Sequence, residues 1–105
     1  MTPEEIQKLN PGRELDELVF KFVLGGRIPK PPYRVNFMKF STDISAAWEV
    51  ESKLIELNLS VSYSEYLRAL IKLDRGYDDL FKMIHATPEQ RCKAALLAVL
   101  GEEQE

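Results

Sequence analysis

A run of glycines and prolines divides this chain more sharply than any other part of its sequence. Residues 25–32 read Gly-Gly-Arg-Ile-Pro-Lys-Pro-Pro. Each proline fixes its own φ angle and lacks a backbone N–H, so the run fits neither a helix interior nor a central strand. We therefore predict an extended linker over 25–32, with a helical segment over 3–24 before it and a second unit over 41–100 after it. Together, residues 1–105 have the size of one domain.

Signals for the start of a helix occur at three places. The segments Thr2-Pro3-Glu4-Glu5 and Thr87-Pro88-Glu89-Gln90 each combine a capping threonine, a proline at the first helical position and a side chain that completes a capping box. Ser41-Thr42-Asp43 offers a third cap. Apolar residues then recur every three or four positions, although Asn10-Pro11-Gly12 interrupts the first segment. These patterns predict helices near 13–24, 42–57 and 88–100.

The helix near 42–57 carries an apolar stripe that we assign to the core. Within this stripe Trp48 is interpreted as a core anchor, because large aromatic side chains contribute most when buried. Asn58 is a suitable left-handed stop for the helix. The stripe consists of Ile44, Ala47, Trp48, Leu54 and Ile55.

Four segments are candidate strands. Leu59, Val61 and Tyr63 alternate with serines, which is typical of a strand with one wet face. Residues 65–85 fit two interpretations: their helix formers favour a helix, whereas apolar residues from Leu67 to Leu73 fall at alternate positions. The candidate strands lie near 33–40, 59–64, 66–73 and 80–84.

Four segments in order resemble a known family, the phage ABA-sandwich domain. They are Thr2-Pro3-Glu4-Glu5-Ile6, Gly12-Arg13-Glu14-Leu15-Asp16-Glu17-Leu18-Val19, Ser41-Thr42-Asp43-Ile44-Ser45-Ala46-Ala47-Trp48-Glu49-Val50 and Thr87-Pro88-Glu89-Gln90-Arg91-Cys92-Lys93-Ala94-Ala95-Leu96-Leu97-Ala98-Val99. The resemblance implies an α-β-α layered fold with strands across 59–84. The expected fold class is thus α+β, an α-β-α sandwich in which about three helices cover a small, mostly antiparallel sheet of three or four strands. The resemblance supplies no catalytic residues.

Composition limits the cellular compartment in which we expect the protein and the kinds of disulfide and metal site that it is able to form. The net charge is −3, and the chain has one cysteine and one histidine. One cysteine excludes an intramolecular disulfide, and one histidine excludes a multi-histidine metal site. The N-terminus lacks the basic and apolar regions of a signal peptide, and no apolar run has the length of a membrane span. We expect a cytoplasmic protein that makes no membrane contact.

Isolated reactive residues do not make a catalytic set. Cys92 falls on the inner stripe of the last helix, where a buried structural thiol is expected. His85 precedes a helix start and has no nucleophile at a motif spacing. Asp74, Asp78 and Asp79 lack the spacing of a calcium loop, so a solvated turn is favoured. We predict no catalytic residue, metal site or cofactor.

One segment combines uncompensated positive charge with aromatic side chains. Cations bind phosphate, and aromatic rings stack on bases, so the segment is a candidate anion-binding site. A solvated loop whose aromatics enter the core is the competing interpretation, and it is favoured. The candidate ligand-binding residues are Arg27, Lys30, Tyr33, Arg34, Phe37 and Lys39.

These observations favour a non-enzymatic phage or prophage accessory protein. It is expected to bind a host or phage protein, or a small phosphorylated ligand. A nucleic-acid-binding module that uses residues 27–40 is the alternative, since the expected α-β-β-β-α order resembles that of double-stranded RNA binding domains. An enzyme is disfavoured because no nucleophile, metal cluster or phosphate loop occurs. The oligomeric state stays open, a homodimer included.

Overall fold

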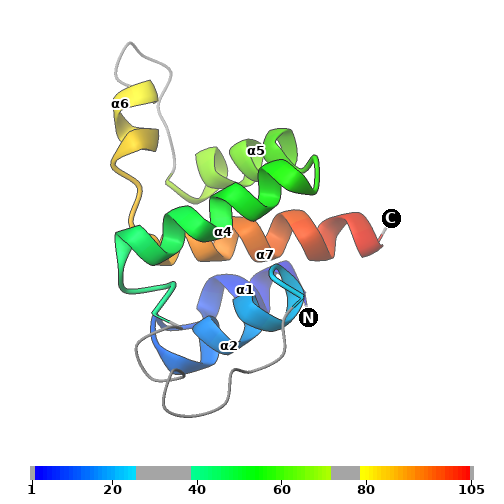
Figure 1. Cartoon of the computed structure of the whole chain (residues 1–105). Coiled ribbons are helices and arrows are strands. Elements are labelled where there is room, and N and C mark those ends of the chain that lie inside the picture. The colour runs from blue at the N-terminus through cyan, green and yellow to red at the C-terminus, as the bar shows by residue number, and fades with distance from the viewer. Residues whose placement is uncertain (1, 26–38, 72–78, 105) are drawn as a thin grey trace.

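A computed structural model describes residues 2–25, 39–71 and 79–104 of the chain. These residues form helices and contain no strand (Figure 1). The predicted α+β sandwich is therefore wrong for the part of the chain that is described, because no sheet of three or four strands lies between its helices. The helices are α1 (Pro3–Lys8), α2 (Arg13–Phe22), α4 (Ile44–Glu56), α5 (Ser60–Leu70), α6 (Asp79–Ile84) and α7 (Pro88–Gln104).

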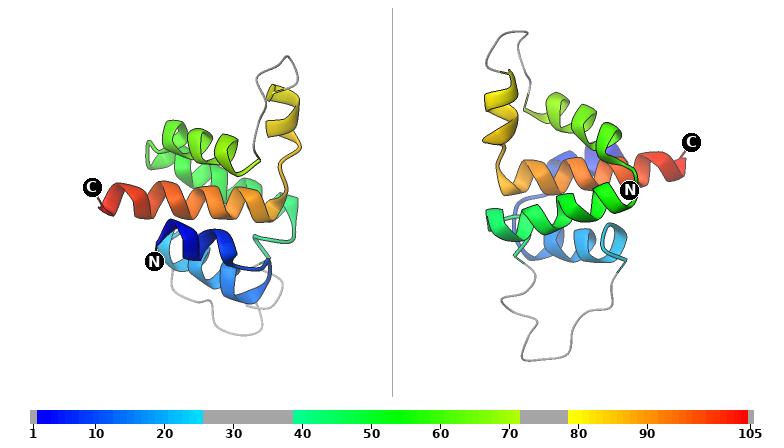
Figure 2. Two further views of the ribbon diagram at one scale, coloured as in Figure 1. Left: turned by 180° about the vertical axis from the view of Figure 1, so that it is seen from behind. Right: turned by 45° about the horizontal axis from the view of Figure 1, so that its top comes forward.

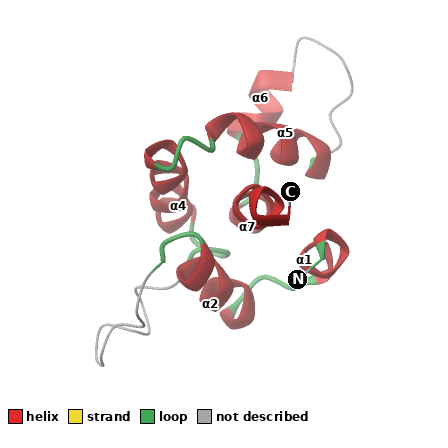
Figure 3. Ribbon diagram, turned by 90° about the vertical axis from the view of Figure 1, so that its right-hand side faces the viewer, coloured by secondary structure: helices red, strands yellow, loops and turns green. Residues whose placement is uncertain are grey.

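Helix α7 is the centre of the bundle. It contacts α1, α2, α4 and α5, and these helices surround it when the molecule is viewed along the α7 axis (Figure 3). The left view of Figure 2 shows α1 and α2 on one side of α7 and α4 and α5 on the other. Every residue over 91–98 is buried. A helix that neighbours cover on all sides is mostly apolar, and its alanines let those neighbours approach closely. Its two buried charges, Arg91 and Lys93, are paired with carboxylates.

Local hydrogen bonds confirm the predicted helix starts. Thr2 and Glu5 form a capping box at α1. Thr87 and Gln90 form the equivalent pair at α7, with 2.9 Å from Thr87 N to Gln90 Oε1 and 3.1 Å from Gln90 N to Thr87 Oγ1. The Asp43 carboxylate caps α4 by accepting from Ser45 N at 2.9 Å. These caps form within a few residues, so the sequence pattern predicts them without knowledge of the fold.

Residues 59–73 do not form the two predicted strands in the range that the structure describes. Helix α5 occupies this region and buries Tyr63 and Leu67, which are four positions apart and therefore share one helix face. Val61, which a strand would place on the same side as Tyr63, is exposed. The packing of α5 against α7 determines the outcome, and the helix formers after Ser64 are compatible with it.

The other predicted strands differ in how far the structure tests them. The segment near 80–84 is helical and belongs to α6. Most of the segment near 33–40 lies outside the described residues, and Lys39 and Phe40 are not in a strand. Asn58 has a φ angle of 60° directly after α4, so the predicted left-handed stop is confirmed.

Buried polar contacts fasten the entry of α4 to α2. Asp16 Oδ1 accepts hydrogen bonds from Ser41 N at 2.7 Å and from Ser41 Oγ at 2.6 Å. Next to this pair, Phe40 is fully buried and stacks on Phe20 with 6.4 Å between ring centroids. Burial raises the pKa of the Asp16 carboxyl, the hydrogen bonds from Ser41 act in the opposite direction, and the charge of Glu17 adds to the rise.

None of the helices in the described ranges combines the length and the apolar character that crossing a bilayer requires.

Candidate interaction surface

Helix α4 carries two apolar lines, and the bundle covers only one of them. Ala47, Val50 and Leu54 point inward and are buried. Trp48 is 56% exposed and Ile55 is 67% exposed. The predicted inner stripe is thus correct for two of its five residues: Ala47 and Leu54 lie in the core, whereas Ile44, Trp48 and Ile55 lie outside it. The apolar residues of α4 thus extend around more of the helix than α5 and α7 cover.

The short helix α6 adds two more exposed apolar side chains. Phe81 is 63% exposed and Ile84 is 62% exposed. The His85 ring stacks on Phe81 with 4.2 Å between centroids, and its Nδ1 lies 3.0 Å from the Phe81 carbonyl oxygen. The Trp48 surface is the name used below for the exposed apolar side chains of α4 and α6, namely Ile44, Trp48, Ile55, Phe81 and Ile84.

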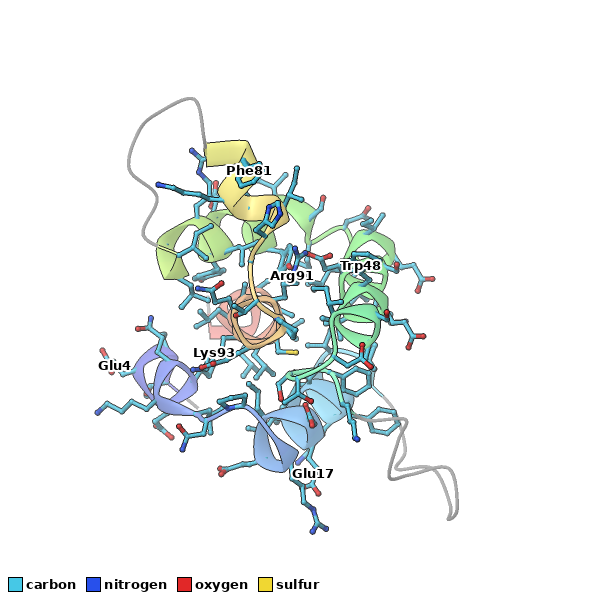
Figure 4. The ribbon with its side chains drawn as sticks, turned by 90° about the vertical axis from the view of Figure 1, so that its left-hand side faces the viewer. Glu4, Glu17, Trp48, Phe81, Arg91 and Lys93 are labelled. Carbon is cyan, nitrogen blue, oxygen red and sulfur yellow. The ribbon has the colours of Figure 1, made fainter. Side chains whose placement is uncertain are left out.

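Arg91 connects the two helices that carry this surface (Figure 4). Its Nη1 donates to Glu51 Oε2 on α4 at 2.7 Å, and its Nη2 donates to the carbonyl of Ile84 at 2.6 Å. Its Nε donates to the carbonyl of Ala86 at 2.9 Å. One guanidinium group therefore joins the middle of α4 to the backbone at the end of α6.

The same carboxylate joins α5 to the network. Tyr63 donates a hydrogen bond from its hydroxyl to Glu51 Oε2. Burial, followed by the hydrogen bond to Glu51, raises the pKa of the Tyr63 hydroxyl, so this group stays protonated and keeps donating. Because Arg91 and Tyr63 both bind Glu51, this network links α4, α5 and α7 to one another and to the backbone at the end of α6.

The sequence profile of a family described as the Phage ABA sandwich domain matches residues 29–96. The matched range covers more than half of the chain and includes α4, α5 and α6. This chain belongs to the phage ABA sandwich domain family. The described parts of the matched range, 39–71 and 79–96, are helical and contain no strand. No curated protein and no solved structure matches the chain.

The predicted anion-binding residues of this phage ABA sandwich protein fall almost entirely outside the described residues. Only Lys39 is described, and it is exposed directly before the buried Phe40. The structure therefore does not test whether these side chains lie together, and the anion-binding site stays a prediction. The untested residues are Arg27, Lys30, Tyr33, Arg34 and Phe37.

Neither Cys92 nor His85 lies in surroundings that are typical of a catalytic residue. Cys92 is fully buried in α7. Burial raises the pKa of its thiol, and the charges of Asp16 and Glu51 add to the rise, so no reactive thiolate is available. His85 lies at the surface on Phe81. Within the described ranges no group of three His, Cys, Asp or Glu side chains is arranged to hold a metal ion.

Sequence reasoning missed the Trp48 surface. A signal was present, because α4 has more apolar residues than one packed face needs, and acids and serines stand on the other side of Trp48. Phe81 and Ile84 gave no such signal, since their apolar run is too short for its period to be read.

Proposed function

We propose that this phage protein acts without catalysis, by binding a protein partner through the Trp48 surface. The exposure of Trp48 carries the proposal, since the indole is more than half exposed and has exposed isoleucines on the same helix. Contiguous exposed apolar side chains on a soluble domain mark interaction sites. Tryptophan is also among the residues that contribute most to binding when a partner covers it.

The buried cations of the bundle do not support a phosphate site in the described residues. Arg91 is occupied by Glu51 and by backbone carbonyls. The Lys93 ammonium group donates to the Gln7 carbonyl at 2.9 Å and to Glu89 Oε2 at 2.7 Å. Both charges serve to satisfy helix ends and carboxylates, so they are not available to an anionic ligand.

The nucleic-acid alternative loses its topological basis. The topological likeness required three strands between two helices, and the described residues over 59–71 and 79–84 contain no strand. The segment 27–40, which is the other basis of this alternative, lies outside the described residues except for Lys39 and Phe40. A protein partner is therefore the candidate that the described surface favours.

A site-specific photo-crosslink tests the proposal. Benzoylphenylalanine replaces Phe81 in the full chain, which is expressed in host cells and irradiated. We expect a discrete adduct with one protein, and we expect Trp48→Ser to abolish it. The control places the same group at Glu14, an exposed position on α2. Identical adducts from positions 81 and 14, or an adduct that survives Trp48→Ser, would contradict the proposal.

A further inference from the structure

The exposed face of α4 is organised in three parallel rows. The spacing of a helix places residues three, four, seven and eleven positions apart close to one line. Ile44, Trp48 and Ile55 form the apolar row, and it is bounded on one side by Glu51 and the end of α6, which Arg91 bridges. On its other side come a serine row and then an acidic row. The serine row is Ser45 and Ser52, and the acidic row is Glu49 and Glu56.

The short side chains of the serine row leave the surface between the apolar and acidic rows close to the helix backbone. Ser52 Oγ donates to the carbonyl of Trp48 at 3.1 Å, so its hydroxyl is turned back onto its own helix. Short side chains whose polar groups are already bonded let another backbone approach closely without losing hydrogen bonds. A partner on this face is thus able to contact the apolar row and the acidic row at the same time.

The acidic row keeps most of its charge for a partner. Glu49 is exposed and forms no ion pair within the described residues. Glu56 is exposed and lies 3.4 Å from Lys53, a surface pair that water screens. Asp43, also exposed, adds a third acid at the start of the helix. Since Arg91 neutralises Glu51, the exposed glutamates of α4, Glu49 and Glu56, lie on the side of the serine row.

The length of the rows suits one secondary structure element. Ile44 and Ile55 are eleven residues apart, so the apolar row spans about 16 Å, or three helical turns. An amphipathic helix binds such a face by laying its own apolar stripe along it, with charged residues at the edge of the stripe.

We propose that the partner of the Trp48 surface is a cationic amphipathic helix, whose apolar stripe covers Trp48 and whose lysines or arginines lie over Glu49 and Glu56. This inference rests on the proposed function and specifies its partner. The apolar side chains provide the contact area, and the complementary charges raise the association rate constant and fix the orientation of the bound helix.

Three synthetic peptides without tryptophan test the inference on the full chain. One has leucines at helical spacing with lysines elsewhere, the second has glutamates in place of the lysines, and the third is a scrambled version of the first. Trp48 is the only tryptophan in the chain, so its emission reports binding directly. We expect the patterned lysine peptide to shift that emission to the blue and to bind at least about tenfold more tightly than either of the others.

A charge-reversal variant makes the test specific. In Glu49→Lys/Glu56→Lys, with folding checked by circular dichroism, we expect the order of the lysine and glutamate peptides to reverse. Equal binding of these two peptides to the parent chain would overturn the cationic assignment and leave the proposed function standing. Equal binding of the scrambled peptide would overturn it too, because unspecific charge attraction would explain the signal.

Two further outcomes separate the inference from the function on which it rests. If no peptide binds but the crosslink from position 81 still forms, the partner is not a cationic helix and the inference alone fails. If the crosslink is absent as well, both fail. Sedimentation that shows a dimer with Trp48 already covered would assign the face to a second copy of the chain and overturn the inference.

Discussion

Arg91 on α7 and Glu51 on α4, which are 40 residues apart in the chain, form an ion pair with 2.7 Å between Nη1 and Oε2. The guanidinium is buried, and its remaining N–H groups donate to carbonyls at the end of α6. One side chain at the start of the central helix therefore bonds both to the middle of α4 and to the backbone after α6.

Removing this guanidinium is expected to destabilise the fold strongly. Arg91→Met removes the positive charge beside the partly buried Glu51, which keeps only the hydrogen bond from Tyr63, and removes the donor to the carbonyl of Ile84. Losing one partner of a buried pair costs about 3 kcal/mol or more of unfolding free energy. Urea denaturation measures the loss. The matched control is Arg13→Met, since Arg13 pairs with Glu17 but its side chain is 88% exposed, and less than about 1 kcal/mol is expected there. Equal losses in the two variants would contradict the role assigned to Arg91.

Truncating Trp48 is expected to change stability little. Trp48→Ala removes an exposed side chain and adds a good helix former, so we expect a change below about 1 kcal/mol. Leu96→Ala is the comparison, because Leu96 is fully buried in α7 and its loss is expected to cost about 2–5 kcal/mol. Denaturation followed by circular dichroism measures both variants. A loss near 3 kcal/mol in Trp48→Ala would show that the indole lies in the core.

Asp16 is expected to make stability fall as pH rises through the acid range. Burial raises its pKa above the ordinary value of 3.8. Between the unfolded and folded pKa values the folded state binds more protons, so the free energy of unfolding decreases as pH increases. Asp16→Asn keeps an acceptor for Ser41 and has no proton to lose. We therefore expect the parent to lose stability relative to Asp16→Asn from about pH 3 upward, until the folded carboxyl is ionised. Denaturation midpoints of both proteins across this range measure the gap, and a gap independent of pH would contradict the prediction.

The pair Gly101 and Tyr66 provides a test of packing between α7 and α5. A Cβ atom at Gly101 would lie 2.6 Å from the Tyr66 hydroxyl oxygen but 3.5 Å from the ring carbon that bears it. Alanine is otherwise about 1 kcal/mol better than glycine inside a helix. We expect Gly101→Ala to stabilise the Tyr66→Phe variant and to be neutral or destabilising in the parent. A double-mutant cycle should give a coupling of about 1 kcal/mol. Additive effects would show that Tyr66 moves aside without cost.

Local chemistry made much of the helical framework predictable. The capping pairs Thr2 with Glu5 and Thr87 with Gln90 form within four residues, and so does the cap of α4 at Asp43. Asn58 is suited to a left-handed backbone by its own side chain. The burial of Cys92 followed from its place among alanines and leucines on a long apolar helix.

Tertiary structure alone decided the form of residues 59–71 and the surface role of Trp48. The alternation of Leu59, Val61 and Tyr63 predicted a strand, but whether a strand or a helix forms depends on whether a neighbouring strand or the helix α7 is there to receive these residues. The apolar arc of α4 likewise shows that some of its residues are buried but not which ones. Which residues of α4 are buried depends on the width of its contact with α5 and α7. This contact buries Val50 and leaves Trp48 exposed. A pattern along one segment carries no information about the shape of a distant segment, so the local sequence determined the capped helices α1, α4 and α7, while packing determined the form of residues 59–71 and the candidate site.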